Sequence, residues 1–595
     1  MNTQLKILMV TALLCDVVGA ASVAEIRIAG DSVAALPQAL EVAVKSGVKK
    51  IIIAPGTYVV DTTLAFRSLT NVTIDATGVT LLRRQPTVRG LDFDRCHHVT
   101  LRGLKLQCAV PPFTQGRVEK LDDAGKWLEL RVDAGYPTNY FGHKTTGYFF
   151  DPATQQWKPG TYDFGFDRAD DLGGGLFRLH GSLGRAPRAC AVGDLMAFRG
   201  PGSADILVAG CSAMEISDVV IRHGSGFCIH EDGGEGGNRY SYAVTYGPKP
   251  PGATAEPLIS ANADAFHSSG VRHGPTLDGC RFEGMCDDGV PIHGSYALVL
   301  AATNADLIVT HGRFFRAGDP LRLFDQRGAL VGEATVVTNR PERGYQMPPL
   351  PKGDLPRVFG ESRDFWRLTL DHPLPAATQF CRASDPNANG SGYVVRHCTI
   401  RNHRARGLLL KADHGLVEDN VIEGSTIAGI IIAPEYWWNE ACYSRDVVVR
   451  RNTIRRCGEA TNGSWDSRPG AVNIAGEGQE KGIAYGHQRI VIEKNTFEDN
   501  AGVNLLVHGA QDVTVRDNRF VRPQQHATNH GRDHYDPSTL IWLAACNGVQ
   551  LEDNRVYERG AFGTNLVGVT RTALNLVGVA TGVQLVRKPW YQFWR

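Results

Sequence analysis

The chain has 595 residues, of which 43% are hydrophobic, and its 63 basic and 62 acidic residues leave a formal net charge of +1. This balance provides no basic surface for nucleic acid and no polybasic patch for a membrane, so we expect neither as a partner. With 66 glycines and only 6 methionines, the composition is typical of a β protein rich in turns.

The N-terminus has the features of a signal peptide. Lys6 is followed by the apolar stretch ILMVTALLCDVVGA, which ends in small residues before Ala21. We therefore predict that residues 1–21 are a signal peptide and that the mature protein is secreted or periplasmic. Residues 22–108 then contain short apolar runs such as IIIAPGTYVVDTTLAF, which predict short strands at the start of a stack of coils.

Two segments interrupt these short runs. Residues 109–200 contain the hairpin RVEKLDDAGKWLELRV and end in VGDLMAFRG, and residues 303–391 contain AGDPLRLFDQRGALVGEATVV. Both combine alternating strands with a Gly-Asp pair that precedes apolar residues. We predict that each forms a small β-barrel or sandwich, and that residues 201–302 between them return to the coils.

Residues 392–595 repeat one pattern, in which a β-branched run is followed by an asparagine and a second short run: Asn420, Asn452, Asn495, Asn518 and Asn554. A glycine followed by apolar residues alternates with it, and Gly407 and Gly429 are 22 residues apart. No amphipathic helix separates the runs, which argues against βαβ units. The sequence therefore predicts an all-β fold, a right-handed parallel β-helix with two inserted small β-barrel or sandwich domains, in which the asparagines form a ladder along the stack.

Thirteen cysteines would allow disulfides in an exported protein. However, Cys96, Cys211, Cys280 and Cys398 each come just before a strand-like run, as if at one recurring buried position. We predict that most cysteines are reduced core residues.

Two polar stretches are one coil apart. Asp264 lies in NADAFHSS, residues 262–269, and Asp287 and Asp288 lie in CDDG about one coil later. Aligning Ala265 with Gly289 places Asp264 and Asp288 on adjacent coils, with backbones about 5 Å apart. Asp287 can join them only if the chain bends there.

A basic column accompanies these carboxylates. His230, His293 and Lys411 each follow a glycine of the repeat by four residues, which assigns them one phase. Aspartates in turns and single histidines are often structural, but the two columns together predict a binding site. Three close carboxylates raise the pKa of at least one of them, and a protonated carboxyl beside ionised ones is the arrangement of glycoside hydrolysis with inversion.

The stretch NADAFHSS…MCDDGVPIHGSYALV resembles the active site of glycoside hydrolase family 110, the inverting α-1,3-galactosidases. The resemblance implies a β-helix with two inserted barrels, an exo-acting hydrolase and no cofactor or metal. It also implies that Asp287 is the general acid and that Asp264 and Asp288 activate water. Substrate contacts are expected from His267, His293 and Lys411, with His230, Glu435 and Trp437 or Trp438 of APEYWWNE as further candidates, a Trp either stacking on a sugar or burying a loop.

Three alternatives remain open. Polygalacturonases of family 28 share the three aspartates, although the Arg-Ile-Lys cluster that would bind a uronate is missing after them. Clustered aspartates would also suit a calcium-dependent polysaccharide lyase. The third is a carbohydrate-binding solenoid without catalysis. An oligosaccharide or polysaccharide is the expected partner in every case, while the sugar, the linkage, exo or endo action, disulfide pairing and homo-oligomer formation are undetermined.

Overall fold

The computed structural model describes residues 25–28, 36–45, 47–142, 146–161, 163–183, 189–351, 357–459, 468, 470–476, 485–528 and 535–586. The predicted signal peptide lies outside these residues. Within them, no helix is long and apolar enough to cross a membrane. The helix α1 (Leu36–Lys45) lies at the N-terminal end of the stack, where Leu36 and Leu40 join the core and cover the first coils.

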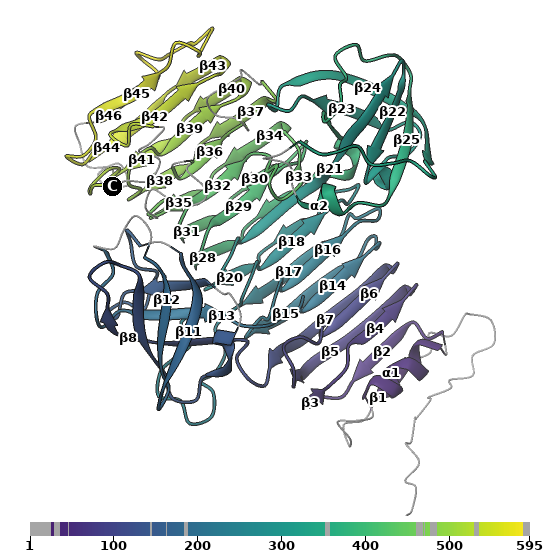
Figure 1. Cartoon of the computed structure of the whole chain (residues 1–595), viewed down its shortest axis with the longest axis vertical. Coiled ribbons are helices and arrows are strands. Elements are labelled where there is room, and N and C mark those ends of the chain that lie inside the picture. The colour runs from purple at the N-terminus through teal and green to yellow at the C-terminus, as the bar shows by residue number, and fades with distance from the viewer. Residues whose placement is uncertain are drawn as a thin grey trace, which may run out of the picture.

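Short strands stack in parallel along the whole molecule (Figure 1). One sheet contains 22 of the described strands, from β1 (Glu25–Ile28) to β46 (Val583–Val586). A second sheet carries the candidate site and includes β14 (Ile206–Ala209), β16 (Ile229–Asp232), β18 (Phe266–Ser269), β21 (Val290–Thr303), β29 (Arg406–Leu410) and β32 (Ala428–Ile432). These strands pair in parallel from coil to coil, so the predicted parallel β-helix is confirmed.

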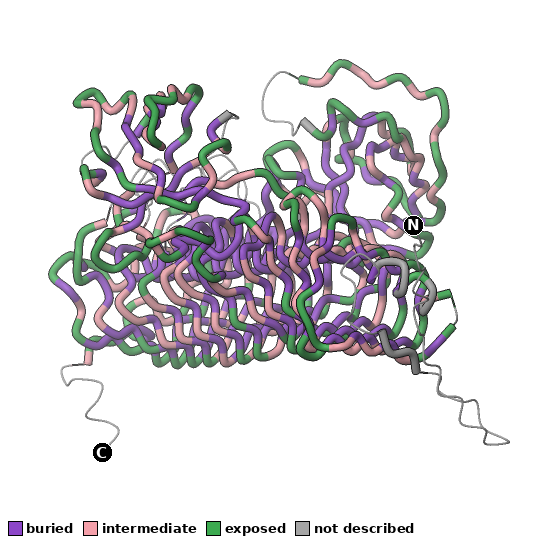
Figure 2. The backbone as a smooth tube through the Cα atoms, turned by 90° about the horizontal axis from the view of Figure 1, so that it is seen from below, coloured by how far each residue is buried: buried purple, intermediate pink, exposed green. Residues whose placement is uncertain are grey.

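The core of the stack is a series of columns of apolar side chains. Ile400 lies opposite Ile422, which lies opposite Ile454, and the column continues through Phe497 and Phe520. The rings of Phe497 and Phe520 stack with their centroids 4.7 Å apart. All five side chains are fully buried, and each contributes about 1.5–3 kcal/mol by leaving water. Figure 2 shows buried residues running through the interior of the coils.

The predicted asparagine ladder is present. Asn420 donates its backbone N–H and its side-chain amide to Oδ1 of Asn452, at 3.0 and 2.9 Å. Asn452 does the same to Asn495, Asn495 to Asn518, and Asn518 to Asn554. Each buried amide therefore satisfies backbone groups at a turn, which is why asparagine recurs there.

The cysteine prediction is also confirmed for the described residues. Cys96, Cys211, Cys280, Cys398 and the eight other cysteines in the described part of the chain are free and buried. They pack as small apolar residues in the interior.

The first inserted domain is a closed antiparallel barrel. Its strands are β8 (Phe113–Leu121), β9 (Trp127–Val132), β10 (Thr146–Phe150), β11 (Phe164–Gly173), β12 (Leu176–Ser182) and β13 (Leu195–Arg199). They pair around the ring in the order β8-β9-β12-β11-β10-β13 and back to β8.

The second inserted domain repeats this topology. Its ring is β21-β22-β25-β24-β23-β26, formed with β22 (Asp306–Thr310), β23 (Pro320–Phe324), β24 (Leu330–Pro341), β25 (Phe365–Leu370) and β26 (Arg382–Ser384). The strand β21 continues from the stack into the barrel. Figure 2 shows both domains projecting from the same side of the stack.

The Gly-Asp pairs build the same turn in both barrels. Oδ2 of Asp194 accepts the N–H of Ala191 at 2.8 Å, and Oδ2 of Asp319 accepts the N–H of Arg316 at 2.6 Å. In each case the aspartate carbonyl accepts an N–H from a strand of the same barrel, at 2.9 Å. The carboxylate thus holds a tight turn that leads into an apolar strand.

Candidate active site

The three aspartates lie in adjacent turns of the second sheet. Asp264 comes before β18, and Asp288 comes before β21. Ala265 donates its N–H to the carbonyl of Asp288 at 3.2 Å, and the N–H of Asp288 donates to Oδ1 of Asp264 at 3.0 Å. The predicted alignment of Ala265 with Gly289 is therefore correct.

The chain bends at Cys286 and Asp287, and this bend allows the side chain of Asp287 to join those of Asp264 and Asp288, as predicted. One oxygen from each of Asp264, Asp287 and Asp288 lies within 4.8 Å of the others. The side chain of Asp287 is 26% exposed, whereas those of Asp264 and Asp288 are 6% and 7% exposed. Asp287 is thus the carboxylate most accessible to a substrate.

Three arginines that the sequence did not single out bind these carboxylates. Arg199, at the end of the first barrel, donates to Oδ2 of Asp287 at 2.8 Å, and Arg404 donates to Oδ1 at 2.7 Å. Arg406 donates its backbone N–H to Oδ1 of Asp288 at 2.8 Å and its side chain lies 2.9 Å from Oδ2. The sequence RAR directly before Gly407 was the available signal for two of them.

The surroundings of the three carboxyl groups shift their pKa values in different directions. Burial raises the pKa of Asp264 well above its ordinary value, with the charges of Asp287 and Glu440 adding to the effect. Burial also raises the pKa of Asp288, although Arg406 opposes it. Burial acts on Asp287 in the same direction, but Arg199 and Arg404 outweigh it and hold its pKa below the ordinary value. In the free protein the proton therefore resides on the buried pair.

Histidines extend the site from Asp264. Oδ2 of Asp264 lies 2.7 Å from Nδ1 of His267, whose Nε2 lies 3.0 Å from Nε2 of His293. Nδ1 of His293 donates to the carbonyl of Gly294 at 2.7 Å. These three bonds need three protons, one more than a carboxylate and two neutral imidazoles carry. The chain from Asp264 to His293 thus holds an extra proton, in agreement with the raised pKa of Asp264.

The predicted basic column is only partly correct. Val290 pairs with Leu408, so His293 and Lys411 share a phase, as predicted. His230, however, lies opposite His267, while His293 lies opposite Ser269. His230 is therefore two residues out of that column, because Cys228, and not Gly226, occupies the position that Gly289 has in its coil: both lie opposite Ala265. It still reaches the site, with its ring centroid 5.3 Å from that of His267.

Phe227 completes this side of the site. Its ring stacks on His267 at 4.2 Å between centroids, and it meets His230 edge-on at 5.3 Å. Burial lowers the pKa of His293 and of His230 to about 4, and it lowers the pKa of His267 as well. The imidazoles are thus mainly neutral hydrogen-bonding groups near pH 7.

Lys411 lies between two glutamates. Its fully buried Nζ is 3.1 Å from Oε2 of Glu435 and forms a closer ion pair with Glu440. Glu440, which the sequence reasoning missed, lies 3.8 Å from Nε2 of His293. Burial acts to raise the pKa of Glu440, but His293 and Lys411 more than offset this and lower it.

Glu435 and Glu440 face each other across a tight hairpin, whose two backbone hydrogen bonds are both 3.0 Å long. Trp437 and Trp438 lie in its turn and are 65% and 63% exposed. The alternative that a tryptophan buries this loop is therefore wrong. Two exposed indoles instead project beside the glutamates that hold Lys411, where a sugar ring could stack on them.

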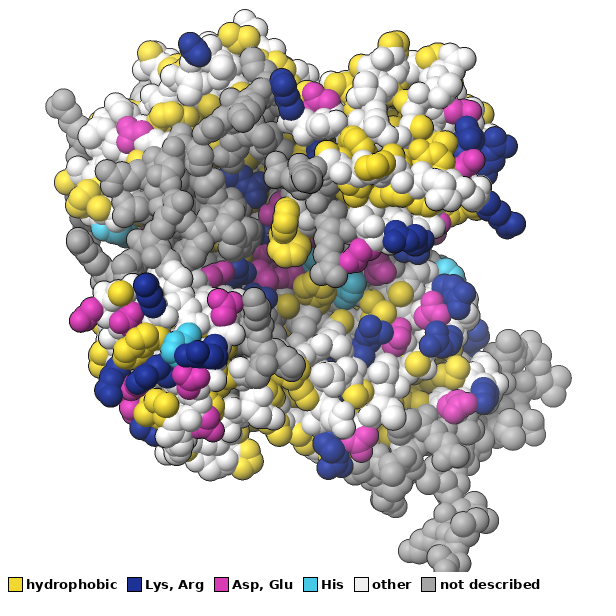
Figure 3. All heavy atoms as spheres, viewed as in Figure 1, with side chains coloured by type: hydrophobic (Ala, Val, Ile, Leu, Met, Phe, Trp, Pro, Cys, Tyr) yellow, Lys and Arg dark blue, Asp and Glu magenta, His cyan; other side chains and the backbone are white. Residues whose placement is uncertain are grey.

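Carboxylates and histidines gather in a hollow between the two barrels (Figure 3). Two sets of donor atoms in the described residues have the spacing of a metal site: the three aspartates, and His267 with His293 and Glu440. The aspartates already bind Arg199, Arg404 and Arg406, and Glu440 binds Lys411. A calcium ion would have to displace these cationic groups, which argues against the calcium-dependent lyase.

Comparisons with known proteins agree with this description. The family described as "Right handed beta helix region" matches residues 387–520. The α-1,3-galactosidase B of Bacteroides thetaiotaomicron is 22% identical over 515 residues, which cover 82% of this chain and 79% of that protein. The α-1,3-galactosidase B of Akkermansia muciniphila is 24% identical over 469 residues, 72% of this chain and 54% of that protein.

Among solved structures, the catalytic unit of the GH87 α-1,3-glucanase from Streptomyces thermodiastaticus aligns with a TM-score of 0.44 and 11% identity, covering 93% of this chain and 66% of that chain. The sequence matches confirm the resemblance seen in the active-site stretch: over most of its length, this chain is related to the α-1,3-galactosidases of glycoside hydrolase family 110.

Proposed function

We propose that the protein is a secreted exo-glycosidase that hydrolyses terminal α-1,3-linked galactose from oligosaccharides or polysaccharides, with inversion at the anomeric carbon. The observation that carries this proposal is the convergence of Asp264, Asp287 and Asp288 within 4.8 Å in adjacent turns of the stack. The relatives named above support the substrate, and the predicted signal peptide supports secretion.

In this proposal, Asp287 is the general acid. It donates a proton to the glycosidic oxygen as the bond from that oxygen to the anomeric carbon breaks. Its greater exposure supports the role, since the acid has to touch the leaving group. Arg199 and Arg404 lower its pKa, so Asp287 has to take up its proton when the substrate binds.

Asp264 and Asp288 are the proposed base. One of them takes a proton from water as its oxygen attacks the anomeric carbon from the opposite face. Their raised pKa values support this role, because a carboxylate with a higher pKa is the stronger base once it is ionised. The chain through His267 and His293 holds a proton next to this base and orients Asp264.

Galactose would bind on the side of the histidines. His267, His293, Lys411 and Glu435 offer neutral and charged partners for its hydroxyl groups, His230 lines the same side, and Trp437 or Trp438 offers a face for the ring. Several polar groups around one ring are what a glycosidase needs for recognition of a single sugar.

The stereochemistry needs a direct measurement. Inverting enzymes usually separate their two carboxyl groups by about 6.5–9.5 Å, and these three are closer. Proton NMR of an α-1,3-galactobioside digest identifies the first anomer released. β-Galactose appearing first supports inversion, α-galactose appearing first excludes it, and no release by the wild-type protein excludes the galactosidase.

Three isosteric variants assign the roles. Asp287→Asn should lose about 10²–10⁴-fold on the galactobioside yet keep activity on a galactoside with an activated nitrophenolate leaving group, which needs no acid. Asp264→Asn and Asp288→Asn should lose activity on both substrates. If Asp287→Asn also fails on the activated substrate, Asp287 is not the general acid.

A further inference from the structure

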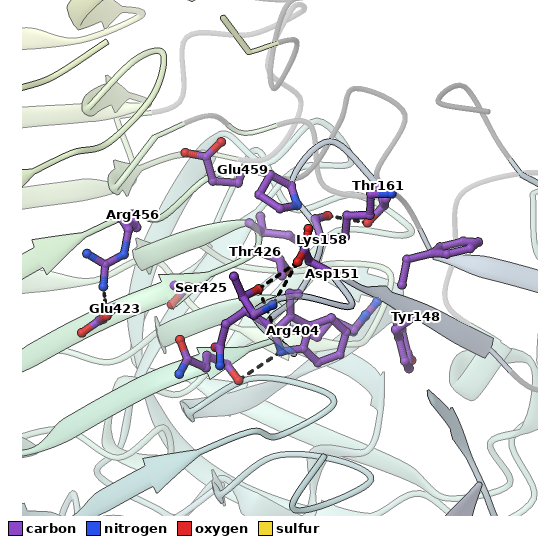
Figure 4. A pocket seen from close by; sticks show the side chains of 18 of the residues that line it. Tyr148, Asp151, Lys158, Thr161, Arg404, Glu423, Ser425, Thr426, Arg456 and Glu459 are labelled. Atoms are coloured by element: carbon purple, nitrogen blue, oxygen red, sulfur yellow. Dashed lines mark hydrogen bonds and ion pairs between the residues drawn. The ribbon is translucent and has the colours of Figure 1, made fainter. Parts of the chain in front are cut away.

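A large cavity lies next to Arg404, which binds Asp287; the three aspartates themselves do not line it. Its volume is about 820 Å³, and it lies between the first barrel and the turns of the coils (Figure 4). The barrel contributes Tyr148, Gln156 and Trp157 among others, and the coils contribute Arg404, Thr426 and Arg456 among others. Cavities of roughly 300–1,000 Å³ hold ligands of a few rings.

Arg404 joins this cavity to the reaction centre. It lines the cavity, donates to Oδ1 of Asp287 at 2.7 Å, and binds Asp163 at 2.6 Å, which also lines the cavity. Asp264, in turn, contacts His267 at 2.7 Å. Contacts therefore lead from the cavity through Arg404 to Asp287, and from Asp264 to the histidines.

A general acid lies between the sugar that is released and the group that leaves, because it protonates the oxygen joining them. With galactose among the histidines, the leaving group extends past Asp287 toward Arg404 and the cavity. We propose that this cavity binds the leaving-group part of a neutral oligosaccharide, so that the preferred substrates carry at least two sugars beyond the terminal galactose. This inference rests on the proposed function.

The walls favour an uncharged saccharide. Among the described residues that line the cavity, each lysine and arginine has a carboxylate partner: Lys158 binds Asp194, Arg404 binds Asp163 and Asp287, and Arg456 binds Glu423. Cations that are already paired give little attraction to a uronate or a sulfate. Neutral sugars need hydrogen bonds and an aromatic surface instead.

Trp157 provides that surface in a fixed position. Its indole N–H donates to the carbonyl of Asn402 at 3.0 Å, and Phe150 packs against its ring at 4.4 Å between centroids. The side chain is only partly buried, so part of the indole faces the cavity. A fixed aromatic ring loses little conformational entropy when a sugar stacks on it.

The first test fills the cavity without disturbing the fold. Gln156 is exposed and lines the cavity, whereas Ala153, three residues earlier in the same loop, is exposed and does not line it. The test compares kcat/KM of Gln156→Trp with that of Ala153→Trp, on the trisaccharide Gal-α-1,3-Gal-β-1,4-Glc and on p-nitrophenyl α-galactoside.

The stacking role of Trp157 has its own variant and control. Trp157→Ala removes the proposed platform, and Trp127→Ala removes a partly buried tryptophan of the same barrel that does not line the cavity. Gln156→Trp and Trp157→Ala should lower kcat/KM for the trisaccharide about tenfold or more, while kcat/KM for the aryl galactoside stays within about twofold of the wild type. Neither control variant should change the ratio of the two kcat/KM values. Equal losses on both substrates, or no loss on the trisaccharide, overturn the proposal.

Binding of lactose, the leaving group of that trisaccharide, is measured by saturation-transfer NMR. Wild type and Ala153→Trp should bind lactose, and Gln156→Trp should not. If the wild type hydrolyses neither substrate, the proposed function fails, while lactose binding that Gln156→Trp abolishes still supports a saccharide site. Absence of lactose binding to the wild type overturns the cavity proposal.

Discussion

Oδ2 of Asp264 and Nδ1 of His267 lie 2.7 Å apart, in a chain of hydrogen bonds that holds one proton more than its neutral imidazoles and carboxylate would carry. The amide of an asparagine can replace a protonated carboxyl there, since it still donates to His267 and accepts from the N–H of Asp288. Asp264→Asn should therefore fold with wild-type stability, within about 0.5 kcal/mol, and lose about 10²–10⁴-fold in kcat.

The urea midpoint and kcat of Asp264→Asn check this expectation together. Wild-type activity in a stable Asp264→Asn would show that Asp264 is not the base. A large loss of stability would show that the carboxyl is ionised in the folded protein, because an amide cannot replace a buried carboxylate that accepts from His267.

The ion pair of Arg404 with Asp287 predicts a shift in the pH profile. Removing the guanidinium in Arg404→Met should raise the pKa of Asp287, which the cation now lowers. If Asp287 acts as an acid, its protonated form is the active one, so the alkaline limb of kcat/KM moves to higher pH. If it acts as a base, the acidic limb moves to higher pH instead.

The control for this profile is Arg401→Met. Arg401 lies three residues before Arg404 and pairs with Glu283 of the adjacent coil at 2.6 Å, not with any of the three aspartates. Its profile should match the wild type. An Arg404→Met profile that also matches the wild type contradicts the idea that Arg404 tunes Asp287.

Lys411 should matter both for stability and for binding. Lys411→Met leaves Glu435 and Glu440 without their shared cation, and breaking a buried ion pair costs about 3–5 kcal/mol. Denaturation should show this loss, and KM for the galactobioside should rise. The double variant Lys411→Met with Glu440→Gln should be more stable than Lys411→Met alone, and a double variant that is less stable would contradict the pairing.

The asparagine ladder predicts a stability effect far from the site. Asn495→Ala removes the acceptor of two Asn452 donors and the donor to the carbonyl of Val449. Each buried group left without a partner costs about 1–3 kcal/mol. The urea midpoint should fall for Asn495→Ala and stay unchanged for Gln550→Ala, an exposed position two coils further along the stack; equal midpoints would contradict a stabilising ladder.

Several features followed from the sequence because they repeat. Asn420 and its counterparts occupy one turn position, so their spacing predicted a ladder before any contact was known. The approach of Asp264 to Asp288 followed in the same way, from the length of one coil. In a stack of similar coils, two residues that are one coil length apart in the sequence lie next to each other in the structure.

Departures from the regular pattern limited this reasoning. The phase of His230 was wrong by two residues, because Gly226 is not the glycine position of its coil, which Cys228 occupies. Glu440 reaches Lys411 only because residues 435–440 form a hairpin, and the repeat pattern of the sequence does not predict that hairpin.

The sequence by itself determined the parallel β-helix, the two inserted β domains and the meeting of three aspartates, since each depends on a local period or on one coil length. Only the tertiary structure decided which carboxyl is paired with cations, because Arg199 arrives from a barrel inserted far earlier in the chain. It also decided that a cavity lies behind Asp287, since barrel and coil walls meet only when the insertion folds back on the stack. Charge and shape at the site depend on such distant contacts, which no local pattern in the sequence encodes.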